Sequence, residues 1–315
     1  PGNPASSLSQ NLEPEYIAVS PDGSIAMVTL QESNAIAIID LEKKEISDLV
    51  GLGFQDHSKV PLDASDKDDS VIIRNWPTFG LFQPDSIVAF TVDGELYFAT
   101  ANEGDARDYD AWSEEARAKD LTLDSTVFPD AETLLQDDNL GRLKVSTNAG
   151  DIDDDGDYDI IFNYGGRSFS ILDADGALVY DSGSVIEERL AIAEPDNFNS
   201  NNDENDSFDS RSDDKGPEPE AIAFAEVDGV PHLFVGLERV GGVAIFDVSD
   251  PKQPTWAGYF NNRDFSGNAE EGTAGDLGPE SIIFIKGEES PTGEPILAVA
   301  NEVSGTVTLF SIEKD

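Results

Sequence analysis

The 315-residue sequence contains no cysteine, so disulfide bonds do not hold its fold together. It also lacks the G-x-S-x-G, P-loop and H-E-x-x-H patterns, which argues against a serine hydrolase, a P-loop nucleotidase and a zinc protease. No apolar run approaches the length of a membrane span. Only two histidines are present. His232 opens an expected strand and is assigned a structural role, whereas His57 lies in a long insertion and is a candidate acid.

Basic residues are scarce: 19 Lys and Arg stand against 65 Asp and Glu, which gives a formal net charge of −46. This charge excludes nucleic acid as a natural partner, because the phosphate backbone would be repelled. Bound Ca²⁺, a saline habitat or both would account for it, since cations screen the repulsion among carboxylates. The 17 Phe residues and a hydrophobic content of 38% are enough for a packed core.

The sequence is rich in one repeated unit, in which a proline precedes an acid and an apolar run, and a second acid closes the next apolar run. The four copies begin at Glu13-Pro14-Glu15, Gln83-Pro84-Asp85, Glu218-Pro219-Glu220 and Gly278-Pro279-Glu280. Asp-Gly dipeptides at 22–23, 93–94 and 228–229 predict tight hairpins between the paired runs. The last copy has a longer loop at 286–295.

These units predict an all-β fold, a β-propeller with about five blade units. Four regular blades begin near Glu15, Asp85, Glu220 and Glu280, and a divergent fifth spans roughly residues 142–181. Residues 1–11 form an N-terminal tail, and residues 12–315 form the propeller domain. The five blades either close a ring or form an arc of a larger one, for example a ring of seven.

Blade geometry predicts where the acids lie. The first strand runs from the top face to the bottom and the second returns, so the start of one and the end of the other meet at the top mouth of the channel. The acids at these positions are Glu15, Glu32, Asp85, Glu103, Glu220, Glu238, Glu280 and Glu302. One interpretation is that each caps exposed backbone amides. The other is a top-face pocket, in which converging carboxylates require cations or arginines.

Four long insertions are expected on the same top face, at 51–81, 104–140, 182–217 and 261–277. Long loops in a compact domain are usually functional or disordered. They supply the candidate catalytic residues Arg74, Asp105, Arg107, Asp108, Arg211 and Arg263. Short helices are predicted at 114–120, 131–136 and 185–192, the last with a capping box formed by Ser184 and Glu187.

The segment Asp151-Ile152-Asp153-Asp154-Asp155-Gly156-Asp157-Tyr158-Asp159 predicts a Ca²⁺ site, because oxygen ligands alternate around a glycine turn. Side chains of Asp151, Asp153, Asp155 and Asp159 and the backbone carbonyl of Asp157 are the expected ligands. Phe162 stands where an EF-hand needs Glu, and the flanks 143–146 and 160–164 are expected strands. The segment resembles the calcium hairpin of integrin-type FG-GAP blades, and it is expected on the bottom face. The alternative is an acidic surface turn.

Several segments resemble the choice-of-anchor I family: NLEPEY (11–16), LDASDKDD (62–69), NEGDARDY (102–109), RSDDKGPEPE (211–220), GLERVGG (236–242) and NEVSG (301–305). The resemblance implies a secreted or surface-anchored, propeller-like protein. It also implies that this chain corresponds to the C-terminal portion of longer family members. A separate N-terminal fragment is therefore one candidate partner.

Two functional classes follow. The first is a calcium-binding protein of the cell surface or extracellular space, with the top face as its contact surface for an extracellular ligand or surface partner. The second is a metal-dependent phosphoesterase, similar to an alkaline phosphatase or phytase, in which top-face acids hold Ca²⁺ and the arginines bind phosphate. The binding protein is the preferred interpretation.

Overall fold

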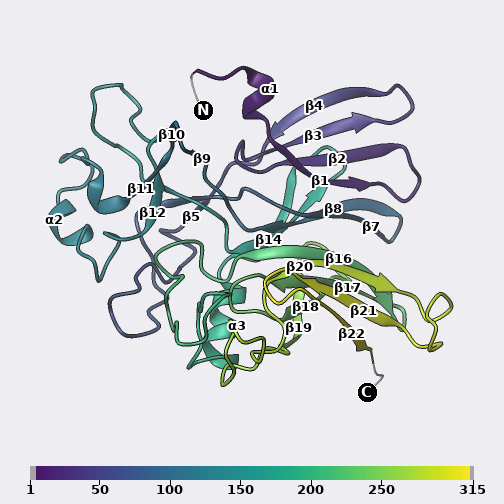
Figure 1. Cartoon of the computed structure of the whole chain (residues 1–315). Helices are drawn as coiled ribbons and strands as arrows, with labels where there is room; N and C mark the ends of the chain where they lie inside the picture. The colour runs from purple at the N-terminus through teal and green to yellow at the C-terminus, as the bar shows by residue number, and fades with distance from the viewer. Residues whose placement is uncertain (1–4, 313–315) are drawn as a thin grey trace.

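The computed structural model describes residues 5–312, and its main body is a series of antiparallel sheets (Figure 1). The first sheet contains β1 (Pro14–Val19), β2 (Ile25–Leu30), β3 (Ala35–Asp40) and β4 (Glu45–Gly51). The second contains β7 (Ile87–Val92), β8 (Glu95–Asn102), β14 (Ser168–Asp173) and β15 (Leu178–Asp181). The third contains β16 (Pro219–Val227), β17 (Val230–Leu237), β18 (Val243–Asp247) and β19 (Thr255–Phe260). The fourth contains β20 (Pro279–Ile285), β21 (Ile296–Asn301) and β22 (Thr306–Ser311). The predicted all-β propeller fold is confirmed.

Tight turns between the first two strands of a sheet follow the Asp-Gly signal. At Asp93-Gly94 both residues have positive φ, 52° and 82°, and at Asp228-Gly229 the values are 53° and 83°. Such turns match the right-handed twist of paired strands, and Asp and Gly are among the residues that adopt them at least cost. In these sheets the chain therefore reverses after the first strand, and the second strand pairs with it antiparallel.

The predicted fifth blade is wrong as a separate unit. Its expected later strands are β14 and β15, which complete the second sheet, because β14 pairs with β8 from Ser168↔Asn102 to Asp173↔Tyr97. The chain leaves the second sheet after β8, forms the insertion, and re-enters the same sheet as β14. The pairing thus joins segments far apart in sequence, which local repeat spacing cannot reveal.

The remaining strands build a side lobe rather than a blade. Its five-stranded sheet contains β5 (Phe54–Asp56), β6 (Phe79–Leu81), β11 (Glu115–Arg117), β12 (Lys144–Ser146) and β13 (Phe162–Asn163). A two-stranded ribbon, β9 (Asp108–Tyr109) and β10 (Trp112–Ser113), lies beside it. The lobe has its own core around Leu62, Trp76, Leu140, Val145 and Ile161. The insertions after β4 and β8 therefore fold together.

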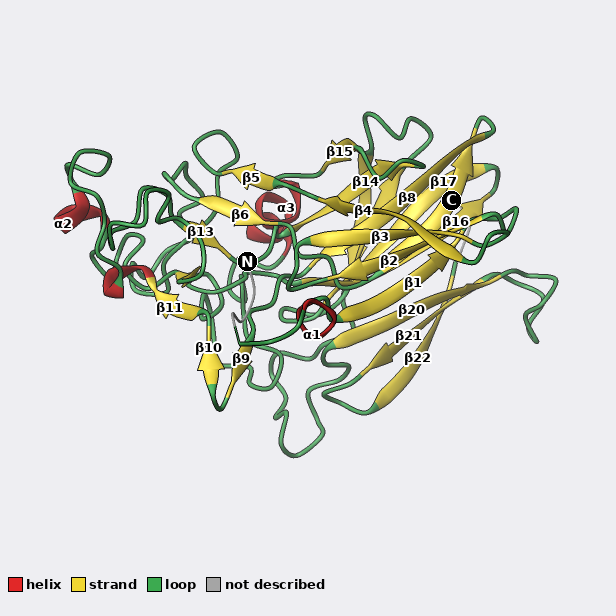
Figure 2. Cartoon of the chain, turned by 90° about the horizontal axis from the view of Figure 1, so that it is seen from above, coloured by secondary structure: helices red, strands yellow, loops and turns green. Residues whose placement is uncertain are grey.

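Apolar side chains between successive sheets hold the propeller body together. Met27 and Phe98 pack between the first two sheets, Phe169 and Phe246 between the second and third, and Ala221 and Ile282 between the third and fourth. The outer faces of the first and last sheets are different: Ile17 is 60% exposed and Val307 is 70% exposed. Figure 2 shows the same sheets from above.

Helices are few and short: α1 (Leu8–Asn11), the 3₁₀ turn η1 (Ala118–Asp120), α2 (Ala131–Leu134) and α3 (Val185–Ala193). The predicted α-helix at 114–120 is wrong, because β11 occupies residues 115–117 and pairs with β12, and only the 3₁₀ turn η1 follows at 118–120. Ser184 does begin α3, but its hydroxyl donates to Glu188 and makes no cap to the backbone. None of the helices in residues 5–312 is long and apolar enough to cross a membrane.

The side lobe leaves and rejoins the second sheet where two glycines touch. Gly104 has φ +89°, and a Cβ there would lie 2.3 Å from the backbone of Gly165. Gly104→Ala should therefore lower the free energy of unfolding by more than about 2 kcal/mol, measured by denaturant titration.

Gly94→Ala is the matched control, because Gly94 has φ +82° but a Cβ there would meet nothing within 4 Å. Gly94→Ala should lower the free energy of unfolding by only about 1 kcal/mol, which is the cost of a positive φ for a residue with a Cβ atom. Equal losses in the two variants would contradict the close approach.

Candidate functional site

The repeated Pro-acid motif has one backbone conformation in all four sheets. The residue before the proline has positive φ: Glu13 44°, Gln83 45°, Glu218 50° and Gly278 70°. In the first, third and fourth sheets, the register shifts directly after the proline. A bulge of this kind bends the strand and redirects a side chain. The motif thus aims an acid away from the regular pleat at the start of each inner strand.

The acids after the proline contribute one carboxylate per sheet, from Glu15, Asp85, Glu220 and Glu280. No ion pair involves any of them within residues 5–312. Carboxylate oxygens of Asp85, Glu103 and Glu220 all lie within 4.8 Å of one another. Glu220 is 5% exposed, and its side chain has no hydrogen bond in the described chain. The two middle sheets therefore bring three predicted site residues together.

Burial and like charge change the protonation of this cluster. Burial raises the pKa of Asp85 to about 7, with Glu103, Glu15 and Glu280 adding to the effect. Burial likewise raises the pKa of Glu220 to about 12, and Glu103 and Asp85 contribute most among the neighbouring acids. Burial also raises the pKa of Glu103 to about 7. Without a metal ion, Glu220 therefore retains its proton at neutral pH.

The acids at the end of the second strand form a neighbouring set, but one position was misassigned. Pro14 pairs with Leu30, Pro219 with Leu237 and Pro279 with Asn301, so Gln31 corresponds to Glu238 and Glu302. The prediction of Glu32 at this position is therefore wrong by one residue. Gln31 donates from Nε2 to Glu103 Oε2 at 2.7 Å.

Glu32 and Glu302 lie at the edges of the same charged region. Burial raises the pKa of Glu32 to about 7, and Glu13, Asp105 and Glu15 contribute. Burial raises the pKa of Glu280, and the charge of Glu302 adds to it.

The centre of the region is Glu218, an acid that the sequence argument did not select. Its side chain is fully buried, and three cations surround it: Arg211 Nη2 at 2.5 Å, Arg239 Nε at 2.9 Å and Lys215 Nζ at 3.0 Å. Burial alone would raise the pKa of Glu218, but the charges of Lys215, Arg211 and Arg239 lower it well below its usual range. Glu218 therefore stays ionised.

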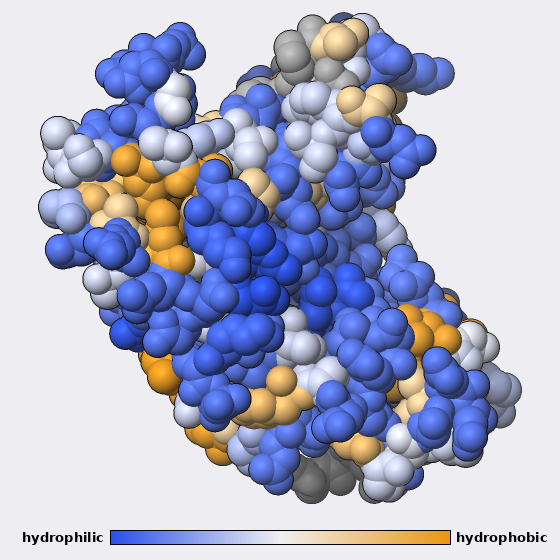
Figure 3. Space-filling view, turned by 60° about the vertical axis from the view of Figure 1, so that its left-hand side comes forward, coloured by the Kyte–Doolittle hydropathy of each residue, from blue (hydrophilic) through white to orange (hydrophobic). Residues whose placement is uncertain are grey.

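The same cations reach the neighbouring acids. Lys215 Nζ donates to Glu103 Oε1 at 2.5 Å, and Arg239 Nη1 lies 3.2 Å from Glu238 Oε1. Beside them is a polar cavity of about 250 Å³, lined in part by Asp105, Lys144, Tyr164, Arg211, Lys215 and Arg239. Figure 3 shows a hollowed face of the molecule with a hydrophilic lining.

The other candidate catalytic residues do not gather at this cavity. Arg107 is buried and bound to Glu13 at 2.9 Å, the Asn11 carbonyl at 2.6 Å and the Ser33 hydroxyl at 2.9 Å. Arg263 donates to the Asn205 side chain and to the carbonyls of Arg239 and Glu204. Arg74 stacks on Trp76, and Asp108 is exposed in β9. Of the six candidates, only Asp105 and Arg211 line the cavity.

Neither histidine is placed for acid catalysis. Burial lowers the pKa of His57 to about 4, and its Nδ1 is 2.9 Å from the carbonyl of Val60. His232 lies within β17, with Nδ1 2.9 Å from the carbonyl of Val230.

The predicted calcium segment is a hairpin between β12 and β13. Carboxylate oxygens of Asp151, Asp153 and Asp159 lie within 4.8 Å of one another. Gly156 turns the chain with φ +100°, and its N–H donates to Asp151 Oδ2 at 3.0 Å. The hairpin belongs to the side lobe, so its predicted place in a blade is wrong.

A second oxygen group of this hairpin was not predicted. The side chain of Asp157, expected to contribute only its carbonyl, meets Asp159 and Asp124 within 4.8 Å. Asp157 Oδ1 is buried without a hydrogen-bond partner. Asp124 is held there because Leu123 forms a bridge with Tyr158.

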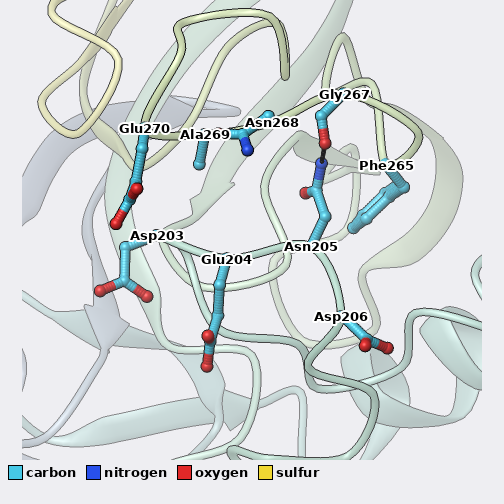
Figure 4. Close-up of a pocket in the computed structure, with 9 residues that line it drawn as sticks. All are labelled: Asp203, Glu204, Asn205, Asp206, Phe265, Gly267, Asn268, Ala269 and Glu270. Atoms are coloured by element: carbon cyan, nitrogen blue, oxygen red, sulfur yellow. Dashed lines mark hydrogen bonds between the residues drawn. The ribbon is translucent and has the colours of Figure 1, made fainter.

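A larger cavity of about 570 Å³ separates two of the insertions (Figure 4). Asp203, Glu204 and Asp206 line it from one loop and Glu270 from the other. Asn205 joins the loops by donating to the Gly267 carbonyl at 2.8 Å. This cavity carries acids but no basic side chain.

Some of the site residues that the sequence analysis did not select could have been found from their positions in the sequence. Glu13 and Glu218 are the first acids of the two Glu-Pro-Glu motifs, and each binds an arginine in the structure. Lys215 and Arg239 lie within a few residues of Glu218 and Glu238. Asp124 had no such signal, because only tertiary pairing brings it to the hairpin.

Comparison with known proteins identifies the family of this chain. The choice-of-anchor I domain matches residues 1–251. The chain belongs to the choice-of-anchor I family. This choice-of-anchor I chain is 37% identical to Gigasin-3a of Magallana gigas over 184 residues, covering 55% of the chain and 64% of the relative. It is 29% identical to the mesenchyme-specific cell surface glycoprotein of Strongylocentrotus purpuratus over 277 residues, covering 77% and 35%. It therefore spans less than two thirds of the length of either relative.

Solved structures also align with this choice-of-anchor I chain. The periplasmic gluconolactonase of Pseudomonas aeruginosa gives a TM-score of 0.33 at 14% identity, covering 95% of the chain and 66% of that structure. The Pan2 WD40 domain of Neurospora crassa gives 0.28 at 10% identity, covering 96% and 64%.

Arg107 has a structural role in this geometry, which predicts the effect of removing it. Arg107→Ala should lower the free energy of unfolding by about 3–5 kcal/mol, because Glu13 and Glu114 lose a buried cationic partner. Arg74→Ala, at an exposed site, should cost no more than about 1 kcal/mol. Equal stability of the two variants in denaturant titration would contradict this role.

Asp63 and Asp209 are buried acids without an ion-pair partner in the described chain. Burial raises the pKa of Asp63 to about 7 and that of Asp209 to about 8, with Glu187 and Asp68 contributing to both. The unfolded chain releases these protons near pH 4, so stability should fall as the pH rises from about 4 to 8.

Asp209→Asn should reduce the stability difference between pH 5 and 8.5 by on the order of 1–3 kcal/mol. The measurement is the free energy of unfolding at each pH. Asp93→Asn, at an exposed turn, should leave the pH dependence unchanged. An unchanged pH dependence in Asp209→Asn would contradict the assignment.

Proposed function

We propose that this chain is a calcium-binding propeller of the cell surface or extracellular space, with the charged channel mouth as its contact face. Membership of the choice-of-anchor I family supports the location, and so does the name of its Strongylocentrotus purpuratus relative, a cell surface glycoprotein. The net charge of −46 supports cation binding, because external cations offset the repulsion that the chain's own bases leave.

The observation that carries the proposal is the Asp151–Asp159 hairpin. Three carboxylates converge within 4.8 Å, all potential donors are oxygen atoms, and Gly156 provides the sharp turn. Hard cations such as Ca²⁺ prefer this donor set. The buried Oδ1 of Asp157, without a partner, also fits a group that lacks its cation.

The contact face is assigned to the 250 Å³ cavity and its rim. Lysine and arginine side chains line it together with Asp105, so both signs of charge are presented to a polar ligand or surface partner. Such a rim favours specificity and fast association more than raw affinity.

The phosphoesterase alternative loses support from the same geometry. Two of the arginines proposed to bind phosphate, Arg107 and Arg263, donate hydrogen bonds to acceptors within the chain instead. His57 is buried and neutral, so it does not serve as the acid. Turnover of a generic phosphomonoester or phosphodiester, with Ca²⁺ present, would restore this alternative.

Removal of the hairpin's ligands tests the calcium proposal. Ca²⁺ at 100 times its Kd should stabilise the chain by about 2.7 kcal/mol through this site, because only the folded hairpin binds it. Asp153→Asn with Asp159→Asn should lower the affinity of this site at least tenfold in calorimetric titration and reduce the rise in Tm.

Asp154→Asn is the matched control, because Asp154 lies in the same turn with φ +60° but in neither carboxylate group. It should keep the calcium response. Equal Ca²⁺ binding by the double variant and the wild type would overturn the proposal.

A further inference from the structure

Two sets of acids at the channel mouth differ in their partners. Glu13, Glu103, Glu218 and Glu238 each contact a lysine or arginine of the chain. The acids after the prolines contact none within residues 5–312, although they come from the same motif. The chain therefore compensates one set of carboxylates and leaves the other without a cation.

The uncompensated charge is most deeply buried between the second and third sheets. Glu220 is 5% exposed, its carboxylate makes no hydrogen bond among the described residues, and it lies within 4.8 Å of the oxygens of Asp85 and Glu103. The side chain of Asp85 also has no hydrogen bond there. Burying a carboxylate without a partner is costly, and a metal ion is one of the few groups that offset the cost.

We propose that Asp85, Glu103 and Glu220 bind a hard divalent cation, Ca²⁺, where the inner strands of the second and third sheets meet. All donors are carboxylate oxygens, and no histidine belongs to the group, which disfavours zinc and copper. Asp85 and Glu220 supply two negative charges without partners, and Glu103 divides its charge between the ion and Lys215. The site is separate from the Asp151–Asp159 hairpin and does not depend on it.

The surrounding contacts give this cation a structural effect. The Ser86 hydroxyl donates to the backbone carbonyl of Glu220 at 2.5 Å, and the Thr29 hydroxyl donates to that of Asp85 at 2.7 Å. These bonds already join the first three sheets at the cluster, from β2, from the residues just before β7 and from β16. A cation held by Asp85 and Glu220 adds a link between the second and third sheets, close to the cavity that Lys215 lines.

Calcium titration of the full chain after chelation tests the site. The wild type should show two classes of Ca²⁺ site, and the hairpin variant Asp153→Asn with Asp159→Asn should retain one. Adding Glu220→Gln to that variant should lower the remaining affinity at least tenfold. Glu280→Gln is the matched control, because Glu280 follows its proline at the same motif position but lies outside the three-carboxylate group.

A stability measurement separates loss of the ion from loss of the fold. In chelator, Glu220→Gln should have a Tm at least equal to that of the wild type, because Gln is uncharged and nearly isosteric with the carboxyl group that it replaces. In the hairpin-variant background, Ca²⁺ should no longer raise that Tm. Asp85→Asn should repeat both results if Glu220→Gln does not fold.

Unchanged Ca²⁺ affinity in the combined Glu220→Gln variant would overturn this inference while leaving the hairpin proposal intact. Loss of binding on Glu220→Gln alone, with the hairpin variant behaving as wild type, would support this site and refute the other.

Discussion

Electrostatic repulsion at the channel mouth is the constraint on which the rest of the structure depends. A propeller starts each inner strand at the same end of the channel, and here each start carries an acid. In the first, third and fourth sheets a register shift after the proline displaces the acid from the regular pleat, and the packing of the second sheet on the third brings Asp85, Glu103 and Glu220 together. These carboxylates can share one place only if protons, basic side chains or metal ions offset their charge.

The insertions supply part of that charge. Arg211 and Lys215 lie in the segment before β16, and they bind Glu218 from above while Arg239 binds it from the end of β17. Burial of an ion pair alone gives little net stability, but removal of one partner leaves an isolated buried charge. The segment before β16 therefore supplies the positive charge that keeps the buried carboxylate of Glu218 paired.

The fold was predictable where pairing is local. Asp93-Gly94 and Asp228-Gly229 mark hairpins whose strands are neighbours in sequence, and both occur where the repeat places them. The second sheet was not predictable in full, because β14 pairs with β8 across the whole side lobe. The site was predictable in part: Asp85, Glu103 and Glu220 converge as the repeat implies, whereas the acid position at the end of β2 is occupied by Gln31 and not by Glu32, because Pro14 pairs with Leu30. Arg107 has the charge of a phosphate ligand but is buried by tertiary contacts that its sequence does not reveal.

Positive charge is scarce both in the whole sequence and at the channel mouth. The chain has 19 basic residues for 65 acids, and several of the basic residues are concentrated on Glu218 and its neighbours. Cations of the chain are held by long side chains, which need space and cost conformational entropy to order. An ion from solution needs neither, and it fits between short carboxylates that approach within 4.8 Å. The post-proline acids have no arginine or lysine of their own within residues 5–312, and Asp85 and Glu220, the two that converge, are the positions at which we propose that a cation from solution completes the structure.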